Sequence, residues 1–157
     1  MNSRCRSKKS NIRAGAFHLT QMVDYGLFFL SVLANGKDPQ SIRSIAKKYN
    51  LSFSFLQKVA NRLKHAELVR ASRGKVGGYV LVCRPSEVTM KQIVEALDNP
   101  IALMDCLLES HVRARTCPRE RFCSVRRGLA RMNNQIREIY TSKTLAEFIL
   151  SDSSVQS

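Results

Sequence analysis

The sequence predicts a mainly α-helical fold with one small β-hairpin and a long helix near the C-terminus. Apolar residues recur at helical spacing in several segments between residues 20 and 97. A glycine-rich segment at residues 73–78 separates two short runs of strand-forming residues. After residue 124 the apolar residues follow a heptad rhythm, which is typical of a helix that pairs with another helix.

Charge is the strongest signal in the composition. The chain has 157 residues, one domain's worth with room for an added arm, and a formal net charge of +14. Such an excess favours a polyanionic partner, with nucleic acid first and a membrane surface second. A membrane surface would require a basic amphipathic helix with a wide apolar face, and the sequence shows none.

Neither a membrane span nor a disulfide framework is expected. The longest largely apolar run, residues 25–34, is far shorter than the ~20 residues that cross a bilayer. We therefore expect a cytoplasmic protein with no membrane partner. Five cysteines is an odd number, and without a secretion signal it favours metal or redox chemistry over structural disulfides.

Both ends are expected to be disordered. Residues 1–16 contain no acidic residue and almost no large apolar one, so they predict a basic tail. Residues 151–157 predict a second short tail. The basic residues of the first tail are Arg4, Arg6, Lys8, Lys9 and Arg13.

The first helix is expected to start after Thr20, a good N-cap, and to stop at Asn35-Gly36. Asp24 lies in its first turn, where the helix dipole favours a carboxylate. Thr20 and Gln21 at the helix N-terminus are expected to hold phosphate. The apolar side is predicted from Met22, Tyr25, Phe28, Phe29, Val32 and Leu33.

Two further helices form a helix-turn-helix. Ser41 caps a short second helix, and Ser52 caps a third after a brief turn. The second helix is expected to bury Ile42, Ile45 and Ala46, and the third to bury Leu56, Val59, Ala60 and Leu63. The first turns of the third helix would then reach base edges in the major groove. The expected base-reading residues are Ser52, Ser54, Phe55, Gln57 and Lys58.

The predicted hairpin pairs residues 68–72 with residues 79–83. Arg73 and Lys75 at its glycine-rich tip are expected to enter the minor groove or hold phosphates, as a DNA-contacting wing does. A phosphate-cradling enzyme loop is the alternative, but no Gly-Lys-Ser/Thr signature or helix follows. Cys83 is expected to be a buried structural thiol. Thr89 caps a fourth helix, predicted to bury Met90, Ile93, Val94 and Leu97, which completes a winged helix-turn-helix DNA-binding domain over residues 17–100.

The long helix belongs to a segment of residues 125–150 and carries one narrow apolar seam between polar residues. Its seam is Val125, Leu129, Met132, Ile136 and Ile139. Pairing of two chains in a homodimer is the economical use of this seam, and packing onto the chain's own core is the alternative. Thr144 and Glu147 then form a capping-box pattern that predicts a last short helix.

Three cysteines in residues 101–124 predict a metal site: Cys106, Cys117 and Cys123. Thiolates are soft ligands for zinc or iron-sulfur clusters, and nearby arginines would offset their negative charge. The gaps exceed the two-residue spacing of zinc ribbons, which favours a cluster. Zinc held by the three cysteines and His111, unliganded thiols, and a redox-active cysteine enzyme are the alternatives.

The arrangement from about residue 18 to residue 149 resembles the IscR/NsrR type of bacterial winged-helix regulators that carry an iron-sulfur cluster. The resemblance rests on the first-helix motif, the recognition helix, the wing, the three cysteines and the late capping box, in that order. These motifs are Leu19-Thr20 with Asp24-Tyr25-Gly26-Leu27, Leu51-Ser52-Phe53-Ser54-Phe55-Leu56, Arg73-Gly74-Lys75-Val76-Gly77-Gly78-Tyr79 and Thr144-Leu145-Ala146-Glu147.

The resemblance implies a dimeric transcription regulator, expected to be a repressor, that binds double-stranded operator DNA. Its [2Fe-2S] or [4Fe-4S] cluster would report nitric oxide, iron supply or redox state. The gap from Cys106 to Cys117 is longer than the family's usual first gap. IscR-like members place a histidine where this chain has Arg126, so their fourth ligand is missing here. NsrR-like members can use a first-helix aspartate, which Asp24 matches, and His111 is the alternative fourth ligand.

Overall fold

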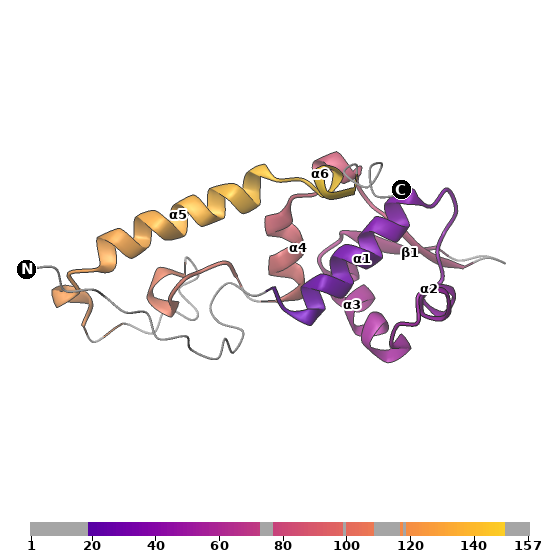
Figure 1. Ribbon diagram of the computed structural model, residues 1–157, viewed down its shortest axis with the longest axis horizontal. Helices are drawn as coiled ribbons and strands as arrows, with labels where there is room; N and C mark the ends of the chain where they lie inside the picture. The colour runs from indigo at the N-terminus through magenta and orange to yellow at the C-terminus, as the bar shows by residue number, and fades with distance from the viewer. Residues whose placement is uncertain (1–18, 73–76, 99, 109–116, 118, 150–157) are drawn as a thin grey trace, which may run out of the picture.

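The computed structural model describes residues 19–72, 77–98, 100–108, 117 and 119–149 (Figure 1). The described helices are α1 (Gln21–Asn35), α2 (Ile42–Lys48), α3 (Phe53–His65), α4 (Met90–Leu97), α5 (Arg126–Ser142) and α6 (Leu145–Ile149). Strands β1 (Val69–Ser72) and β2 (Gly78–Leu81) form the hairpin, and the short 3-10 turns are η1 (Pro85–Glu87), η2 (Asp105–Leu107) and η3 (Glu120–Phe122). The predicted mainly α fold with a β-hairpin wing is confirmed.

The elements form two regions, which we name the head and the arm. The head comprises residues 19–98 with the C-terminal segment 143–149, and the arm comprises residues 100–142. In the head, α1 lies against α3 and α4, and α2 packs on α3. In the arm, α5 extends away from the head, and residues 100–108 lie below it in this view (Figure 1).

The head has a conventional apolar core. Phe29, Leu56, Leu63 and Ile93 are all fully buried in it, so α1, α3 and α4 share a single interior. The approach of α1 to α4 is so close that a Cβ atom on Gly26 would overlap the Leu97 side chain. Close packing of this kind makes the head rigid, because an interior without voids has no room for side chains to shift.

Helix starts agree with the predicted caps. The Thr20 hydroxyl accepts a hydrogen bond from the Val23 N–H at 3.4 Å, and Ser41 and Ser52 accept from Ser44 and Phe55 at 3.1 Å and 3.4 Å. Such caps satisfy backbone donors that the helix itself cannot pair. Thr89 and Gln92 form a reciprocal capping box at the start of α4.

The predicted inner face of α1 is partly wrong. Met22, Tyr25, Phe28 and Val32 are only half-buried, whereas Val23 and Leu30 take their places in the fully buried core. The helix is apolar on most of its circumference, so apolar spacing alone did not determine which side faces α3 and α4.

The wing is fixed at its base. Strands β1 and β2 are antiparallel, with Val69 opposite Leu81 and Ser72 opposite Gly78. Gln40, just before α2, exchanges two backbone hydrogen bonds with Tyr79, at 2.9 Å and 3.0 Å. A Cβ atom on Gly78 would lie 2.6 Å from the Gln40 backbone, so glycine is required for this contact. The position of the wing relative to the helix-turn-helix is therefore set by backbone contacts.

Two details of the hairpin differ from the prediction. The second strand ends at Leu81: the Val82 N–H still donates to the Leu68 carbonyl, and the chain then bends at Val82 and Cys83. Cys83 lies in that bend and is exposed, so the expectation of a buried thiol was wrong.

Among the described residues, no helix has the length and apolar character needed to span a bilayer.

Candidate functional site

The N-terminal part of α3 presents a polar surface. Ser52, Ser54, Gln57 and Lys58 are exposed, and the hydroxyl oxygens of the two serines lie 3.2 Å apart. These side chains stand on the face opposite to the buried apolar side of α3. The helix is held by its core contacts, so the exposed residues are free to meet a partner along one edge.

Phe55 is placed differently from the other predicted base-reading residues. Its side chain is half-buried, and its ring meets the Tyr25 ring edge-on with 4.7 Å between centroids. This contact joins α3 to α1, so Phe55 contributes to the packing beneath the polar surface. Phe53, which the predicted set omits, is 44% exposed at the first position of α3.

The predicted phosphate contacts are only partly described. Gln21 is exposed at the start of α1, and the Thr20 oxygen is engaged as the N-cap acceptor. Arg73 and Lys75 lie outside the described residues. The two strands that lead to them, β1 and β2, are described and form the base of the wing.

The three cysteines predicted as ligands line one cavity. Cys106, Cys117 and Cys123 are half-buried around a space of about 370 Å³ that residues 104–107 and 119–124 form with the start of α5. Leu107, Phe122, Val125 and Leu129 are among the apolar residues of its wall, and Arg119 and Arg126 contribute positive charge. We name this space the cysteine cavity.

Local backbone structure brings the cysteines to the cavity. Cys106 is the middle residue of η2, and Cys123 directly follows η3. The Arg126 N–H donates to the Cys123 carbonyl at 3.4 Å, which links that cysteine to the first turn of α5. The cavity is thus built on the same helix that carries the heptad seam.

The thiols share a cavity without converging on one point. Within the described part of the chain, no three His, Cys, Asp or Glu side chains are close enough together to hold a metal ion. His111, the alternative ligand, lies outside the described residues.

Asp24 does not lie in the cysteine cavity. It is exposed and lines a separate cavity of about 300 Å³ between α1 and α6, together with Phe28 and Phe148. Within one chain, therefore, the structure does not bring the predicted fourth ligand to the three cysteines.

Two polar contacts hold the chain where it passes from the head into the arm, one within each region, and the sequence analysis identified neither. Asn133 on α5 is only 3% exposed, and its side-chain oxygen accepts a hydrogen bond from the Leu103 N–H at 2.8 Å. The Arg62 guanidinium on α3 donates to the Leu97 carbonyl, at the end of α4. Both contacts hold the segment that runs from α4 to Cys106. The only sequence signal for this buried residue was an asparagine next to a seam position. It did not stand out, because Asn134 and Gln135 follow it directly.

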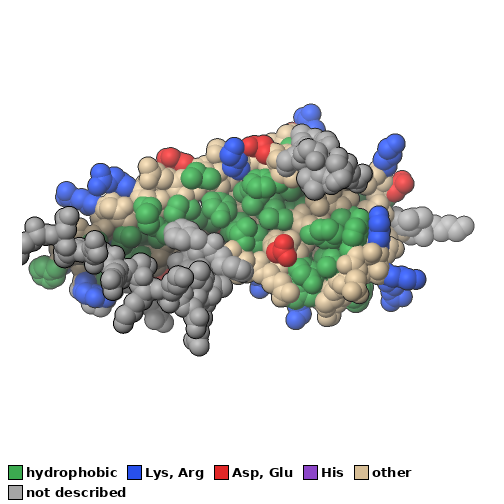
Figure 2. Space-filling view, in the orientation of Figure 1, with side chains coloured by type: hydrophobic (Ala, Val, Ile, Leu, Met, Phe, Trp, Pro, Cys, Tyr) green, Lys and Arg blue, Asp and Glu red, His purple; other side chains and the backbone are tan. Residues whose placement is uncertain are grey.

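The heptad seam divides into two stripes. Val125, Met132 and Ile139 are 60%, 42% and 59% exposed, and they are spaced seven residues apart. Leu129 and Ile136 are half-buried, because Leu129 lines the cysteine cavity and Ile136 lines a small cavity between the arm and the head. We name the first set the exposed stripe. Figure 2 shows hydrophobic side chains gathered along α5 on the face in view.

Comparison with known proteins gives a consistent match. The family model Rrf2, described as an iron-dependent transcriptional regulator, matches residues 19–150. The chain is 34% identical over 125 residues to the HTH-type transcriptional regulator CymR of Bacillus subtilis, covering 78% of this chain and 83% of CymR. It is 26% identical over 140 residues to the HTH-type transcriptional regulator NsrR of Halalkalibacterium halodurans, covering 88% and 94%.

Solved structures agree on the fold. The structure of CymR, described as the global cysteine regulator of B. subtilis, has a TM-score of 0.64 and 29% identity, covering 85% of this chain and 97% of CymR. The IscR structure from T. potens has a TM-score of 0.66, covering 89% and 92%; its 24% identity supports the fold alone.

Proposed function

The chain belongs to the Rrf2 family of transcriptional regulators, and on this basis we propose that it is a cytoplasmic DNA-binding repressor controlled by an iron-sulfur cluster. The observation that carries the proposal is the cysteine cavity, which Cys106, Cys117 and Cys123 all line although ten residues separate the first two and five separate the last two. Three thiols in one cavity on the arm give the protein a sensing site apart from its DNA-reading surface.

The residues of the cavity fit a cluster by their chemistry. Thiolates are the usual ligands of iron-sulfur clusters, and a [2Fe-2S] or [4Fe-4S] group needs more space than a single zinc ion. Arg119 and Arg126 would offset the negative charge of the thiolates, while the apolar wall restricts water. A bound cluster would supply a group that reacts with nitric oxide or oxidants, or that is lost when iron is scarce. The proposal therefore covers any of these three signals. Relatives with the same fold respond to different signals, since they include a cysteine regulator.

The fourth ligand is proposed to be Asp24 of the partner subunit. Asp24 lies outside the cysteine cavity of its own chain, so a bond to the cluster would have to come from a second chain. The exposed stripe on α5 supplies the surface on which two chains would meet in a homodimer. Since Asp24 lies on α1, this bond would link the sensing site to the head that reads DNA. His111 remains the alternative.

DNA recognition is proposed for the head. The polar edge of α3 would enter the major groove of double-stranded DNA, with Ser52, Ser54, Gln57 and Lys58 reaching base edges. Phe55 supports this helix from beneath by its contact with Tyr25. Thr20, Gln21, Arg73 and Lys75 are proposed to contact phosphates or the flanking minor groove. A homodimer would then require a nearly palindromic operator.

Anaerobic purification with iron and sulfide counts and an absorption spectrum tests the proposed cofactor. We expect a coloured protein containing iron and sulfide, and loss of the colour in Cys106→Ser, Cys117→Ser and Cys123→Ser. Cys83→Ser is the matched control, because that thiol is exposed and outside the cavity. A colourless protein with one zinc per chain would contradict the proposal and support the zinc site with His111.

Operator binding tests the proposed head. We expect Gln57→Ala to change the ranking of DNA sequences, because the side chain is exposed on the base-reading edge. Arg73→Gln should weaken binding to all sequences by ~1 to 3 kcal/mol. If Gln57→Ala weakened binding to all sequences equally, as Arg73→Gln is expected to do, α3 would not be the element that reads bases.

A further inference from the structure

Phe53 stands out among the residues of α3, all of which the structure describes. The other large apolar residues of this helix are buried or half-buried, whereas Phe53 is 44% exposed. It directly follows the N-cap Ser52, so its ring projects from the first turn of the helix. A single exposed aromatic side chain is ordinary by itself, so what Phe53 does is decided by its place on the helix and by its surroundings.

The surroundings of Phe53 are polar and positively charged. The Arg43 guanidinium on α2 lies over the ring, 6.0 Å from its centroid, which restricts the orientations of the ring. Ser52 and Ser54 are its exposed neighbours in sequence. From residue 41 to residue 65 the chain contains several lysines and arginines but no aspartate or glutamate. An apolar ring set in such a surface suits a partner that is largely anionic and locally apolar.

Double-stranded DNA offers that combination in its major groove. The phosphates supply negative charge, and the 5-methyl group of thymine is the apolar group that unmodified bases present there. A phenylalanine at the start of a recognition helix lies where side chains reach base edges. Such a contact would distinguish thymine from the other bases because it removes the methyl group from water, and it needs no hydrogen bond.

We propose that Phe53 is a specificity-determining residue that reads a thymine in each half-site by contact with its 5-methyl group. This inference rests on the proposed DNA-binding function and adds a residue that the polar edge of α3 does not include. It requires only that α3 enters the major groove with its first turn facing the bases.

Uracil substitution isolates this contact, because uracil pairs as thymine does and lacks only the methyl group. The full chain, purified anaerobically, would first select its preferred duplex from a random-sequence library. Each thymine of a half-site would then be replaced by uracil. We expect one replacement to lower the affinity of the unaltered protein about fourfold, which corresponds to the ~0.8 kcal/mol of one buried methyl group.

Variants then assign the methyl contact to Phe53. In Phe53→Ala the same uracil replacement should cost nothing, and Phe53→Leu should keep part of the discrimination. Tyr49→Leu is the control, because Tyr49 is also a partly exposed aromatic residue near a cation, Lys48, but lies before the recognition helix. It should retain the full loss on uracil replacement.

Failure of thymine reading by Phe53 and failure of sequence-specific DNA binding give different results. If uracil lowers the affinity of Phe53→Ala and the unaltered protein equally, or lowers neither, Phe53 does not read thymine. If the selection returns no preferred sequence, sequence-specific DNA binding itself is wrong. Folding of Phe53→Ala, checked by circular dichroism, is expected to be unchanged because the ring is exposed.

Discussion

The head and the arm are built from similar proportions of apolar residues but use them differently. Every buried hydrophobic residue of the described chain lies in the head. In the described part of the arm, Asn133 alone is buried, while Phe122, Val125 and Ile139 are each more than half exposed. A region with so little buried apolar surface offsets little of its conformational entropy. The head therefore has a core of its own, and the proposed homodimer and cluster would each bury apolar surface that the arm leaves exposed.

The chain passes between the head and the arm at two joints, one after α4 and one after α5, and hydrogen bonds hold the chain at both. At one, Asn133 holds Leu103 and Arg62 holds the end of α4. At the other, the Met90 N–H donates to the Lys143 carbonyl and the Leu145 N–H to the Val88 carbonyl, each at 2.8 Å. A change of state in the arm would therefore be felt at α4, which packs on α1 and α3.

The largest expected effect comes from charging the exposed stripe. Met132→Glu with Ile139→Glu should give monomers, because two carboxylates would be forced into an apolar interface. Loss of the second DNA-binding head should then reduce operator affinity on the order of a hundredfold. Sedimentation and DNA-binding measurements would show both effects.

Asn134→Glu with Thr141→Glu is the matched control for the stripe. These residues have the same spacing and are exposed, but they line a polar groove on another face of α5. The control should remain dimeric. Dimers that survive Met132→Glu with Ile139→Glu would show that the stripe is not the interface, and Leu129 with Ile136 would be the next positions to test.

The same substitution, phenylalanine to alanine, should have different effects on stability in the head and in the arm. Phe29→Ala should lower the free energy of unfolding by about 3–5 kcal/mol, because the ring is fully buried between packed elements. Phe122→Ala on the arm should change it by less than ~0.5 kcal/mol, since that ring is 87% exposed. Urea denaturation measures both. A comparable loss in the two variants would mean that the arm is packed in solution.

The joint at Asn133 should show an intermediate effect. Asn133→Leu would leave the Leu103 N–H without its acceptor in a partly buried position, which costs about 1–3 kcal/mol. Amide hydrogen exchange should quicken at Leu103 and leave the core of α3 unchanged. Asn134→Leu, at the exposed neighbouring position, is the control. Unchanged exchange at Leu103 would contradict a role of Asn133 in holding the joint.

The sequence predicted the head better than the arm, for a physical reason. Caps and periodic apolar residues are local signals, so Thr20, Ser41, Ser52 and Thr89 were identified as helix starts, as the structure confirms. The heptad rhythm also predicted α5. It could not show that Leu129 and Ile136 turn toward their own chain, because that depends on where residues 101–107 lie against α5.

Long-range contacts account for the other differences. Phe55 follows the spacing of a polar face, yet its contact with Tyr25, thirty residues earlier in the chain, draws it into the packing. Cys83 follows a strand, but the bend after Leu81 exposes it. The sequence analysis expected the three cysteines to share a metal site, and the structure places them around one cavity without bringing the thiols together, whereas the placement of Asp24 in another cavity had no local signal.

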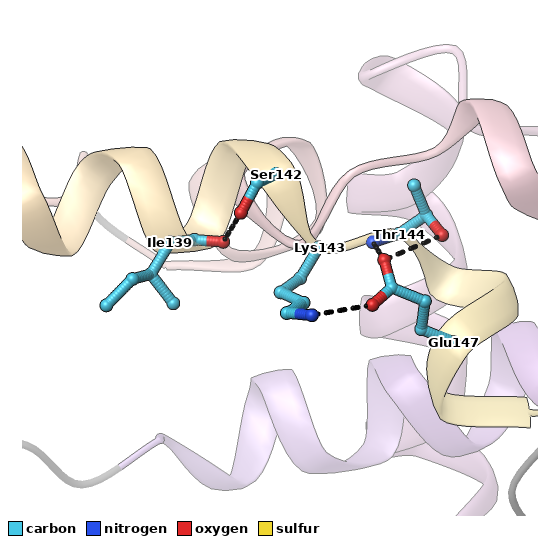
Figure 3. Close-up of polar contacts among 5 residues, drawn as sticks. All are labelled: Ile139, Ser142, Lys143, Thr144 and Glu147. Carbon is cyan, nitrogen blue, oxygen red and sulfur yellow. Dashed lines mark hydrogen bonds and ion pairs between the residues drawn. The ribbon is translucent and has the colours of Figure 1, made fainter.

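The smallest expected effect is a pH dependence at the second joint, shown in Figure 3. The Lys143 ammonium donates to one Glu147 carboxylate oxygen at 2.8 Å, and the Thr144 N–H donates to the other at 3.0 Å. These hydrogen bonds, that from Lys143 first, lower the pKa of the Glu147 carboxyl below its usual value. The folded state thus favours the ionised carboxyl, and its contribution to stability is present above the unfolded pKa of ~4.3.

That contribution should disappear as the pH falls through the lowered folded pKa. Glu147→Gln should therefore be slightly less stable than the unaltered protein at pH 7, and the difference should shrink below pH ~4 as the carboxyl of the unaltered protein becomes protonated. Urea midpoints measured across this range test the sign, with Glu138→Gln, an exposed glutamate on α5, as control. Since Glu147 is exposed to solvent, salt should weaken the effect. A difference that grew on acidification would mean that the neutral carboxyl, not the ion, is favoured in the folded joint.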